Sequence, residues 1–519
     1  MRRFLLGTAV LAAVTLAVGL TPAATAAPVT PSVAATVQAQ QSTVRWGPCI
    51  DPGLIKVGAQ CAMIPVPLDY AHPQGQQIQL AISRVRHTVP DAQYQGVMLV
   101  NPGGPGGSGL TLSLLGSSVP NGGGNYYDWI GFDPRGVGSS VPAVRCDRQY
   151  FGFDRPSYVP TTEAIEQAWL TKANGYAAAC AAHNGPILEH LTTIDSAKDM
   201  DSIRKALGVG QINYYGFSYG TYLGQVYGTL FPNRVRRMVL DSNVDPQRIW
   251  YLANLDQDVA FNRNMDIWFG WLAKYNNVYH LGNTETAVRS GWYAILHRLQ
   301  SHPAGGLIGP SEWTDIFLTA GYYQQTWLDL ASTFANYVHN NDVKDLEQQY
   351  LAANSYGDDN GYAVYLGVQC TDKQWPLSWA TWERDNWRTY AKAPFETWSN
   401  AWYNEPCRVW PAPAQHPVTI NGSKVRSALL IDETLDAATP YPGSLEVREL
   451  FPHASLIALP GGTNHANSLN GDACLDNQIA AYLTSGALPP RLSGDRADTT
   501  CAPLPQPVPL TARAPATVG

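Results

Sequence analysis

The feature of this sequence that most restricts its fold is an alternation of short apolar runs with helix-like segments between Tyr94 and Asp245. The predicted strands are Gly96–Asn101 (GVMLVN), Tyr126–Asp133 (YYDWIGFD), Gln211–Gly216 (QINYYG) and Arg237–Leu240 (RMVL), and the predicted helices are Thr161–Ala182, Ser196–Leu207 and Tyr219–Phe231. The pattern resumes with a strand at Arg426–Asp432, a helix at Gly443–Leu450 and a strand at Ser455–Leu459. Such alternation favours an α/β fold with a mostly parallel central sheet.

Between the two halves of this pattern lies a segment of a different kind. Residues from about Pro246 to Pro417 form long helix-like stretches and carry most of the 16 tryptophans. We expect residues 246–420 to be a large, mainly helical cap inserted between two core segments, 42–245 and 421–489. The aromatic surplus suits subsites for apolar or prolyl peptide side chains, with interior packing as the alternative.

The first residues resemble a targeting segment. Met1-Arg2-Arg3 is followed by an uncharged run to Leu20 and then by Ala24-Thr25-Ala26, a small-residue cleavage site. This pattern predicts a secretory signal peptide at residues 1–26, with an uncleaved membrane anchor as the alternative. Residues 27–41 have no apolar period and are expected to be a pro-segment or a loose arm, and residues 490–519 to be a Pro/Ala-rich tail.

Composition and cysteine usage narrow the class of protein. Charged residues make up 14% of the 519 residues and the net charge is −7, without a Lys/Arg block, so we expect no nucleic-acid partner. The eight cysteines include no C-x-x-C pair and no histidine at zinc-finger spacing, so we expect no metal and no cofactor. An even number in an exported chain favours disulfides. Eight cysteines allow 105 pairings, among which we predict neighbour pairing: 49–61, 146–180, 370–407 and 474–501.

The predicted chemistry starts at Gly216-Phe217-Ser218-Tyr219-Gly220, a G-x-S-x-G between a predicted strand and a predicted helix. This is the place of a nucleophile elbow, where glycines permit a tight strand-to-helix turn that exposes the serine hydroxyl. The alternative is a serine that only caps the helix. The context favours Ser218 as a nucleophile.

A nucleophilic serine needs a base, and the base needs an acid that orients it. In chains with a nucleophile elbow the order is serine, acid, histidine, with the acid after a late strand. The strand RSALLID leads to Asp436, and the strand SLIALP leads to His465 in a glycine-rich loop. We predict Asp436 as the acid and His465 as the base. The alternatives are Asp432 or Glu433 for the acid and His453 for the base.

The oxyanion that forms during acyl transfer needs backbone donors. The loop Asn101–Gly109 (NPGGPGGSG) follows a buried strand and lacks the lysine of a phosphate-binding loop. We expect its Gly104 amide and the amide of Tyr219 to form the oxyanion hole. Asp133 and Arg135 in FDPRG are interpreted as a structural turn near that loop.

At this point the motifs resemble a known family. The loop NPGGPGGSG resembles the HGGPG signature of prolyl-iminopeptidase-like α/β hydrolases, with Pro102 in place of the histidine. FDPRGVGSS, GFSYGTYLG, LDAATP and GGTNH together resemble the secreted tripeptidyl aminopeptidases of actinobacteria, over nearly the whole mature chain. The resemblance implies an α/β-hydrolase fold with the cap inserted before the acid and His loops. It also implies a secreted, extracellular serine exopeptidase that releases tripeptides, or sometimes tetrapeptides.

An aminopeptidase must hold a charged amine at a fixed distance from its nucleophile, which calls for carboxylates in the cap. Asp372 in QCTD and Glu405 in NEPC are the candidates, with helix capping or solvent exposure as the alternative. Asp358 and Asp359 are weaker candidates. The expected partners are peptides with a free amino terminus, and the protein is expected to be monomeric, without stable membrane association after signal cleavage. The rival functions are a carboxylesterase or lipase with the same triad, and a non-catalytic binding protein of this fold.

Overall fold

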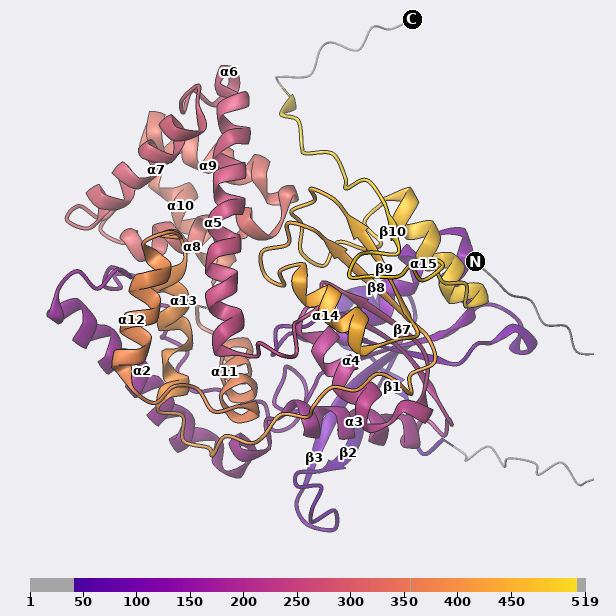
Figure 1. The fold of residues 1–519 in the computed structure, drawn as a ribbon. Helices are drawn as coiled ribbons and strands as arrows, with labels where there is room; N and C mark the ends of the chain where they lie inside the picture. The colour runs from indigo at the N-terminus through magenta and orange to yellow at the C-terminus, as the bar shows by residue number, and fades with distance from the viewer. Residues whose placement is uncertain (1–41, 355, 511–519) are drawn as a thin grey trace, which may run out of the picture. The chain divides into compact units, whose positions relative to one another are not determined.

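The computed structural model describes residues 42–354 and 356–510, all of which belong to one compact unit. One sheet of ten strands runs through it in the order β1-β2-β3-β5-β4-β6-β7-β8-β9-β10 (Figure 1). The strands are β1 Gly47–Pro48, β2 Gln60–Pro67, β3 Gln77–Val85, β4 Val97–Asn101, β5 Asp128–Phe132, β6 Ile212–Phe217, β7 Val235–Asp241, β8 Ala428–Glu433, β9 Ala454–Leu459 and β10 Thr499–Thr500.

The sheet is parallel from β5 to β10 and antiparallel from β1 to β3, with β3 also antiparallel to β5. The predicted mostly parallel α/β sheet is therefore confirmed. The antiparallel strands at its amino-terminal edge were not predicted. The sequence pattern for these strands is weaker, because β2 and β3 are only partly buried and mix polar with apolar residues.

Helices cover both faces of the parallel strands, which explains why these strands are continuous apolar runs. In β4, Leu99 points to the face covered by α3 and α4, while Met98 and Val100 point to the face covered by α15. The helices of this part are α1 Pro52–Lys56, α3 Thr193–Ala206, α4 Tyr219–Leu230, α14 Pro442–Leu450 and α15 Ala473–Ser485.

The inserted segment contains helices and, in its described residues, no strand. These helices are α5 Tyr251–Lys274, α6 Asn276–Tyr279, α7 Glu285–Leu299, α8 Pro310–Tyr322, α9 Trp327–Asn340, α10 Val343–Ala353, α11 Asn360–Asp372, α12 Trp379–Tyr390 and α13 Thr397–Asn404. Ten of its thirteen tryptophans are buried, and five of these lie in one cluster of the cap helices: Trp268, Trp271, Trp292, Trp313 and Trp327. They form the cap's own hydrophobic core, which is the interior-packing alternative considered above.

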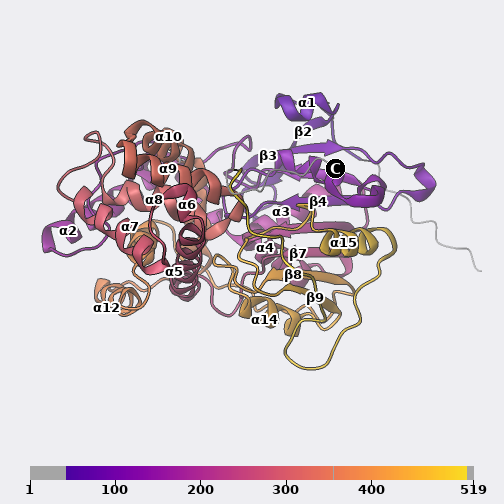
Figure 2. The same cartoon turned by 90° about the horizontal axis from the view of Figure 1, so that it is seen from above.

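Helix α2 (Glu163–Asn184) precedes β6 in the chain but packs with the cap. Its Trp169 stacks on Trp402 of α13 with ring centroids 5.9 Å apart, and Figures 1 and 2 both show α2 among the cap helices. The cap is therefore built from two separate stretches of the chain, of which periodicity alone identified only the longer.

Four disulfides join neighbouring cysteines, as predicted: Cys49–Cys61, Cys146–Cys180, Cys370–Cys407 and Cys474–Cys501. The last of them anchors the tail, whose β10 adds to the sheet beside β9. Farther along, the tail reaches the cap, where the indole of Trp271 donates to the Pro507 carbonyl at 2.9 Å. No helix in the part of the chain described by the structure is long and apolar enough to cross a membrane. The predicted signal peptide and the segment 27–41 lie outside the described residues.

Candidate active site

Ser218 occupies a strained turn between β6 and α4. Its backbone has φ 55° and ψ −128°, a region that costs a non-glycine residue about 1–3 kcal/mol. The flanking glycines make the turn possible, since a Cβ on Gly216 would lie 2.5 Å from the Gly220 carbonyl oxygen and one on Gly220 would lie 2.8 Å from that of Asn101. The turn places Ser218 at the carboxyl end of β6, on the wall of a cavity.

Asp436 and His465 come together at the carboxyl ends of β8 and β9. His465 Nδ1 lies 2.8 Å from Asp436 Oδ2, and both side chains are buried. Asp436 also accepts hydrogen bonds from the amides of Ala438 and Thr439 at 2.8 and 3.1 Å, and from the Thr439 hydroxyl at 2.9 Å. These bonds hold the carboxylate in one orientation.

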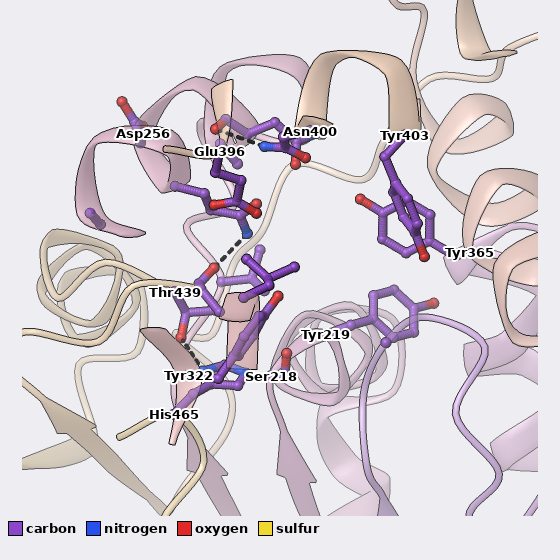
Figure 3. A pocket seen from close by; sticks show the side chains of 18 of the residues that line it. Ser218, Tyr219, Asp256, Tyr322, Tyr365, Glu396, Asn400, Tyr403, Thr439 and His465 are labelled. Atoms are coloured by element: carbon purple, nitrogen blue, oxygen red, sulfur yellow. Dashed lines mark hydrogen bonds between the residues drawn. The ribbon is translucent and has the colours of Figure 1, made fainter. Parts of the chain in front are cut away.

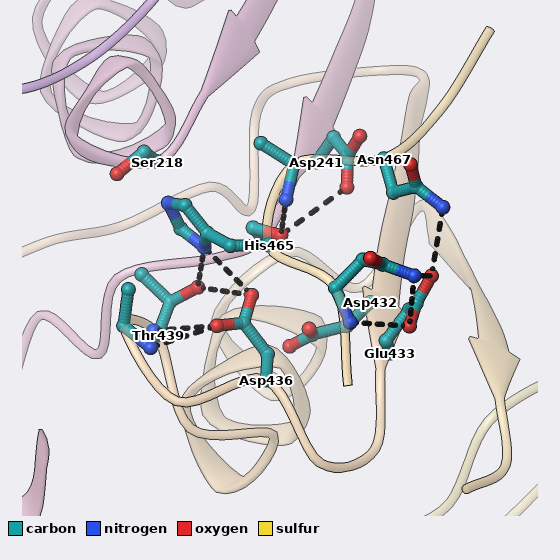
Figure 4. A network of polar contacts seen from close by, with 12 residues as sticks. Ser218, Asp241, Asp432, Glu433, Asp436, Thr439, His465 and Asn467 are labelled. Atoms are coloured by element: carbon teal, nitrogen blue, oxygen red, sulfur yellow. Dashed lines mark hydrogen bonds and ion pairs between the residues drawn. The ribbon is translucent and has the colours of Figure 1, made fainter. Parts of the chain in front are cut away.

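The environment favours protonation of His465. Burial lowers its pKa, but the charge of Asp436 and the hydrogen bond to it outweigh burial, so that the pKa of His465 is raised above its ordinary value. Thr439 Oγ1 lies 3.4 Å from the same Nδ1. Figure 4 shows Ser218 on the side of the imidazole away from Asp436, so Nε2 is the nitrogen left to face the serine.

The rival acids are engaged elsewhere. Asp432 accepts a hydrogen bond of 2.6 Å from Ser444 Oγ, and Glu433 accepts from the Asn464 amide at 2.7 Å and from Asn467 Nδ2 at 3.0 Å. Figure 4 shows both on the far side of the loop from Ser218. His453 lies before β9, at the opposite end of that strand from His465. The structure thus brings together the predicted trio of Ser218, Asp436 and His465.

The predicted oxyanion donors are Tyr219, which directly follows Ser218, and Gly104, in the glycine loop beside it. A Cβ on Gly103 would lie 2.7 Å from the Ser218 Cβ and 3.0 Å from the Tyr219 amide nitrogen, so the glycine loop passes directly over the elbow. Gly104 has φ +107°, and both Gly104 and Tyr219 line the cavity. In the part of the chain that the structure describes, neither amide donates a hydrogen bond to another residue. Both are therefore free to bind an oxyanion.

The cavity above Ser218 has a volume of about 1050 Å³ and is shared between core and cap (Figure 3). Core loops supply Ser218, Thr439 and His465, and cap helices supply much of the remaining wall. Several tyrosines line it, but Trp250 is the one tryptophan among the described residues that do so. Of the cap's aromatic side chains that we expected to suit substrate subsites, tyrosines line the cavity, whereas the described tryptophans other than Trp250 do not.

Cap helices also hold the Asp436 and His465 loops in place. The Tyr322 carbonyl at the end of α8 accepts the His465 amide at 3.0 Å. Asn264 Nδ2 of α5 donates to the Leu435 carbonyl at 3.0 Å, and Arg263 donates to the Leu435 and Asp436 carbonyls. The cap therefore helps to position the acid and the histidine as well as covering the serine.

The predicted amine-binding residues, Asp372 and Glu405, do not line the cavity. Asp372 accepts the Thr193 amide at 2.7 Å and the Thr193 hydroxyl at 2.6 Å, which makes it a cap for α3. Glu405 is fully buried and pairs with Arg408. Asp372 therefore corresponds to the helix-capping alternative, whereas Glu405 is a buried ion-pair residue, which neither the prediction nor its alternative anticipated. A position beside a cysteine does not tell which face of a helix the side chain takes.

The remaining acids of the motifs have structural contacts too. Asp359 accepts the amides of Cys146 and Asp147 at 2.7 Å each, and Asp358 pairs with Arg145. Asp133 accepts the Ser108 hydroxyl at 2.6 Å and the Gly109 amide at 3.0 Å, bracing the glycine loop. Among residues 42–354 and 356–510, no group of three or more His, Cys, Asp or Glu side chains is arranged to hold a metal ion.

Sequence reasoning missed two residues of the site. Thr439 belongs to the same LDAATP motif as Asp436, and its spacing of three residues is the signal that was available. Glu396 lines the cavity from the cap, just before α13. No sequence pattern distinguishes it from the other cap carboxylates.

Comparisons with known proteins show which family this chain resembles. A family model described as alpha/beta hydrolase fold matches residues 96–304, and one described as TAP-like protein matches residues 393–501. The tripeptidyl aminopeptidase of Streptomyces coelicolor is 40% identical, over 92% of this chain and 89% of its own length. The serine protease Hip1 of Mycobacterium tuberculosis is 29% identical, over 86% of this chain and 90% of its own length.

Two further similarities are to a relative that is named as an esterase and to a solved structure of low sequence identity. Carboxylesterase B of Mycobacterium tuberculosis is 32% identical, over 83% of this chain and 85% of its own length. Among solved structures, an acetylester hydrolase from Corynebacterium glutamicum covers 82% of this chain and is itself covered to 95%, with 12% identity and a TM-score of 0.37.

Proposed function

The chain belongs to the tripeptidyl aminopeptidase family of α/β hydrolases, and on this basis we propose that it is an exported serine exopeptidase that releases tripeptides, or sometimes tetrapeptides, from free amino termini. The observation that carries the proposal is the buried Asp436–His465 pair on a cavity wall that also carries Ser218. Asp436 orients His465, and His465 faces Ser218.

In the proposed reaction, Ser218 Oγ attacks the scissile carbonyl carbon while His465 Nε2 takes the hydroxyl proton. Asp436 keeps the imidazole in the correct tautomer and stabilises its charge. The amides of Gly104 and Tyr219 bind the oxyanion of the tetrahedral intermediate. His465 then gives the proton to the leaving amine, and an acyl-enzyme remains on Ser218. A water molecule, deprotonated by His465, hydrolyses that ester and releases the short peptide.

The surroundings of the site suit an exopeptidase outside the cell. The cap covers Ser218, so a short chain end reaches the nucleophile whereas a folded protein does not. The four disulfides are typical of exported chains. We propose that residues 1–26 are removed on export and that the mature protein acts as a monomer on peptides.

A direct test is to digest a peptide library with the purified protein and to measure product masses. We expect tripeptide fragments from the amino terminus, and a loss of at least about 10⁴-fold in Ser218→Ala. A fluorophosphonate probe should label the wild type but not Ser218→Ala. An unchanged Tm in Ser218→Ala separates loss of the nucleophile from misfolding. Full peptidase activity in Ser218→Ala would falsify the proposed mechanism.

An esterase with the same triad is the second candidate, because carboxylesterase B is also a relative. The chemistry of acyl transfer is shared, so the discriminating feature is recognition of the substrate amine. Equal rates for a free tripeptide anilide and its N-acetylated form, together with faster cleavage of a short-chain ester, would favour the esterase.

A further inference from the structure

Four carboxylic acids line the cavity, and three of them are already engaged. Asp256 pairs with Arg248. Asp315 accepts hydrogen bonds from Arg155 at 2.6 Å and from the Tyr158 hydroxyl at 2.8 Å, and Asp245 accepts the Gln247 amide at 2.8 Å. The fourth acid, Glu396, has no such partner.

Glu396 is buried on the cap side of the cavity. Its exposed fraction is 6%, and its Oε2 atom has no hydrogen-bond partner among the described residues. Figure 3 shows it on the opposite side of the cavity from Ser218 and His465. The described cations that line the cavity are Arg248, Arg263 and Lys392. Arg248 pairs with Asp256, Arg263 donates to the backbone carbonyls of the Asp436 loop, and Lys392 is exposed.

A buried carboxyl group without a partner lowers the stability of the fold, because it has lost its hydrating water without gaining a hydrogen bond. A ligand that donates a hydrogen bond removes this cost. Burial, together with the charges of Asp258 and Asp315, raises the pKa of Glu396 well above its ordinary value. An arriving ammonium group is the kind of ligand that offsets this shift, because it lets the carboxyl ionise within an ion pair.

The rest of this wall suits a cation as well. Tyr322, Tyr365 and Tyr403 also line the cavity. Figure 3 shows Tyr365 and Tyr403 together on one side of it and Tyr322 beside His465. Their hydroxyl oxygens accept hydrogen bonds from an ammonium group, and their ring faces attract one through cation–π interaction. Burial raises the pKa of Tyr322 well above its ordinary value, and the charge of Glu396 adds to this shift.

We propose that Glu396 binds the free α-amino group of the peptide substrate. The amino terminus is then held by the cap while the scissile carbonyl meets Ser218, so that the span between the two sets the length of the released peptide. This inference rests on the proposed exopeptidase function and adds to it the residue that recognises the substrate's charged end. It replaces the sequence-based expectation for Asp372 and Glu405.

The test compares a tripeptide p-nitroanilide with its des-amino analogue, which lacks only the α-amino group. Removing one partner of a buried charge pair costs a factor of about 30 to 5,000 in binding. We expect Glu396→Gln to lower kcat/KM for the free-amine substrate by about that factor. The same variant should change kcat/KM for the des-amino substrate by no more than about twofold. This substrate lacks the amine, so the interaction with Glu396 is already absent and cannot be lost again.

Controls separate this result from general damage. Rates are expressed per active site by fluorophosphonate titration of Ser218, and Glu396→Met serves as a second variant that removes the buried polar group. Asp256→Asn, which changes another cavity acid, should lower kcat/KM for the free-amine substrate by less than about threefold. The inference is overturned if Glu396→Gln lowers kcat/KM equally for the free-amine and the des-amino substrate. It is also overturned if Asp256→Asn lowers kcat/KM for the free-amine substrate as much as Glu396→Gln does.

The outcome also distinguishes this inference from the proposed function. If the wild type cleaves both substrates equally well, it does not recognise the amine and the exopeptidase proposal fails. If the wild type prefers the free amine and Glu396→Gln keeps that preference, the exopeptidase proposal stands and Glu396 is not the anchor.

Discussion

The site depends on backbone positions that few residue types tolerate. Ser218 adopts a positive φ of 55°, and the loop above it passes so close that a Cβ on Gly103 would lie 2.6 Å from the Phe217 carbonyl oxygen. A side chain at Gly103 would push the glycine loop away from the nucleophile. The strain is retained because β6, α4 and the glycine loop determine the turn from three sides.

The ionisation of His465 sets the acid limit of the proposed activity. A general base acts in its neutral form, and the pKa of His465 is raised above 6.5 because Asp436 outweighs burial. We therefore expect kcat/KM to fall as the pH falls through a value above about 6.5. Asp436→Asn should move this limit to lower pH and reduce kcat by about 10⁴-fold.

The measurement is a pH profile of kcat/KM in the wild type and in Asp436→Asn. Asp432→Asn is a suitable control, because Asp432 bonds to Ser444 and not to His465. An acid limb that stays at the same pH in Asp436→Asn would contradict the assignment of Asp436.

Among the elements, α13 links substrate recognition to cap stability. Glu396 directly precedes it, and Trp402 within it stacks between Trp169 of α2 and Trp379 of α12, at centroid distances of 5.9 and 4.9 Å. The Trp402 indole also donates to the Tyr158 carbonyl at 2.7 Å. One aromatic side chain thus joins two sequence-distant parts of the cap.

Removal of this ring should loosen the cap. We expect Trp402→Ala to lower the free energy of unfolding by about 3–5 kcal/mol, the usual cost of deleting a buried aromatic side chain. It should also raise KM for free-amine substrates, since Glu396 loses its support. Denaturant unfolding and steady-state kinetics measure the two effects. Leu377→Ala, at a cap position that is 64% exposed, should change stability by less than about 0.5 kcal/mol.

At the scale of the whole molecule, the fold keeps several carboxyl groups buried. Burial raises the pKa of Asp372, Glu405 and Glu433 to about 7 each. A carboxyl group whose pKa is higher in the folded than in the unfolded chain stabilises the fold while it is protonated, and this contribution is lost as the pH rises through 7. Stability should therefore decrease from about pH 5.5 to about pH 8.

Thermal unfolding across this range checks the direction, with Tm expected to be higher at the acid end. Glu433→Gln removes one of the titrating groups and should make the decrease smaller, by about 1–2 kcal/mol in unfolding free energy. A Tm that rises with pH over this range in the wild type would show that these groups ionise freely in the folded protein.

Much of the fold and part of the site could be predicted because the signals are local. A buried parallel strand needs a continuous apolar run, a nucleophile elbow needs glycines around Ser218, and short loops favour disulfides between neighbouring cysteines. The order of Ser218, Asp436 and His465 follows from the strands that precede them. These features depend on residues close together in the chain, so the sequence by itself determined them.

The tertiary structure decided which side chains face the cavity. Asp372, Glu405 and Glu396 are all cap carboxylates in helical surroundings, and only packing turned the first toward Thr193, the second toward Arg408 and the third toward the cavity. It likewise buried the cap tryptophans and brought α2 to the cap. The physical reason is that the face a helix buries is chosen by its distant partners, whereas the turns and strands that carry Ser218, Asp436 and His465 are set by their own neighbours.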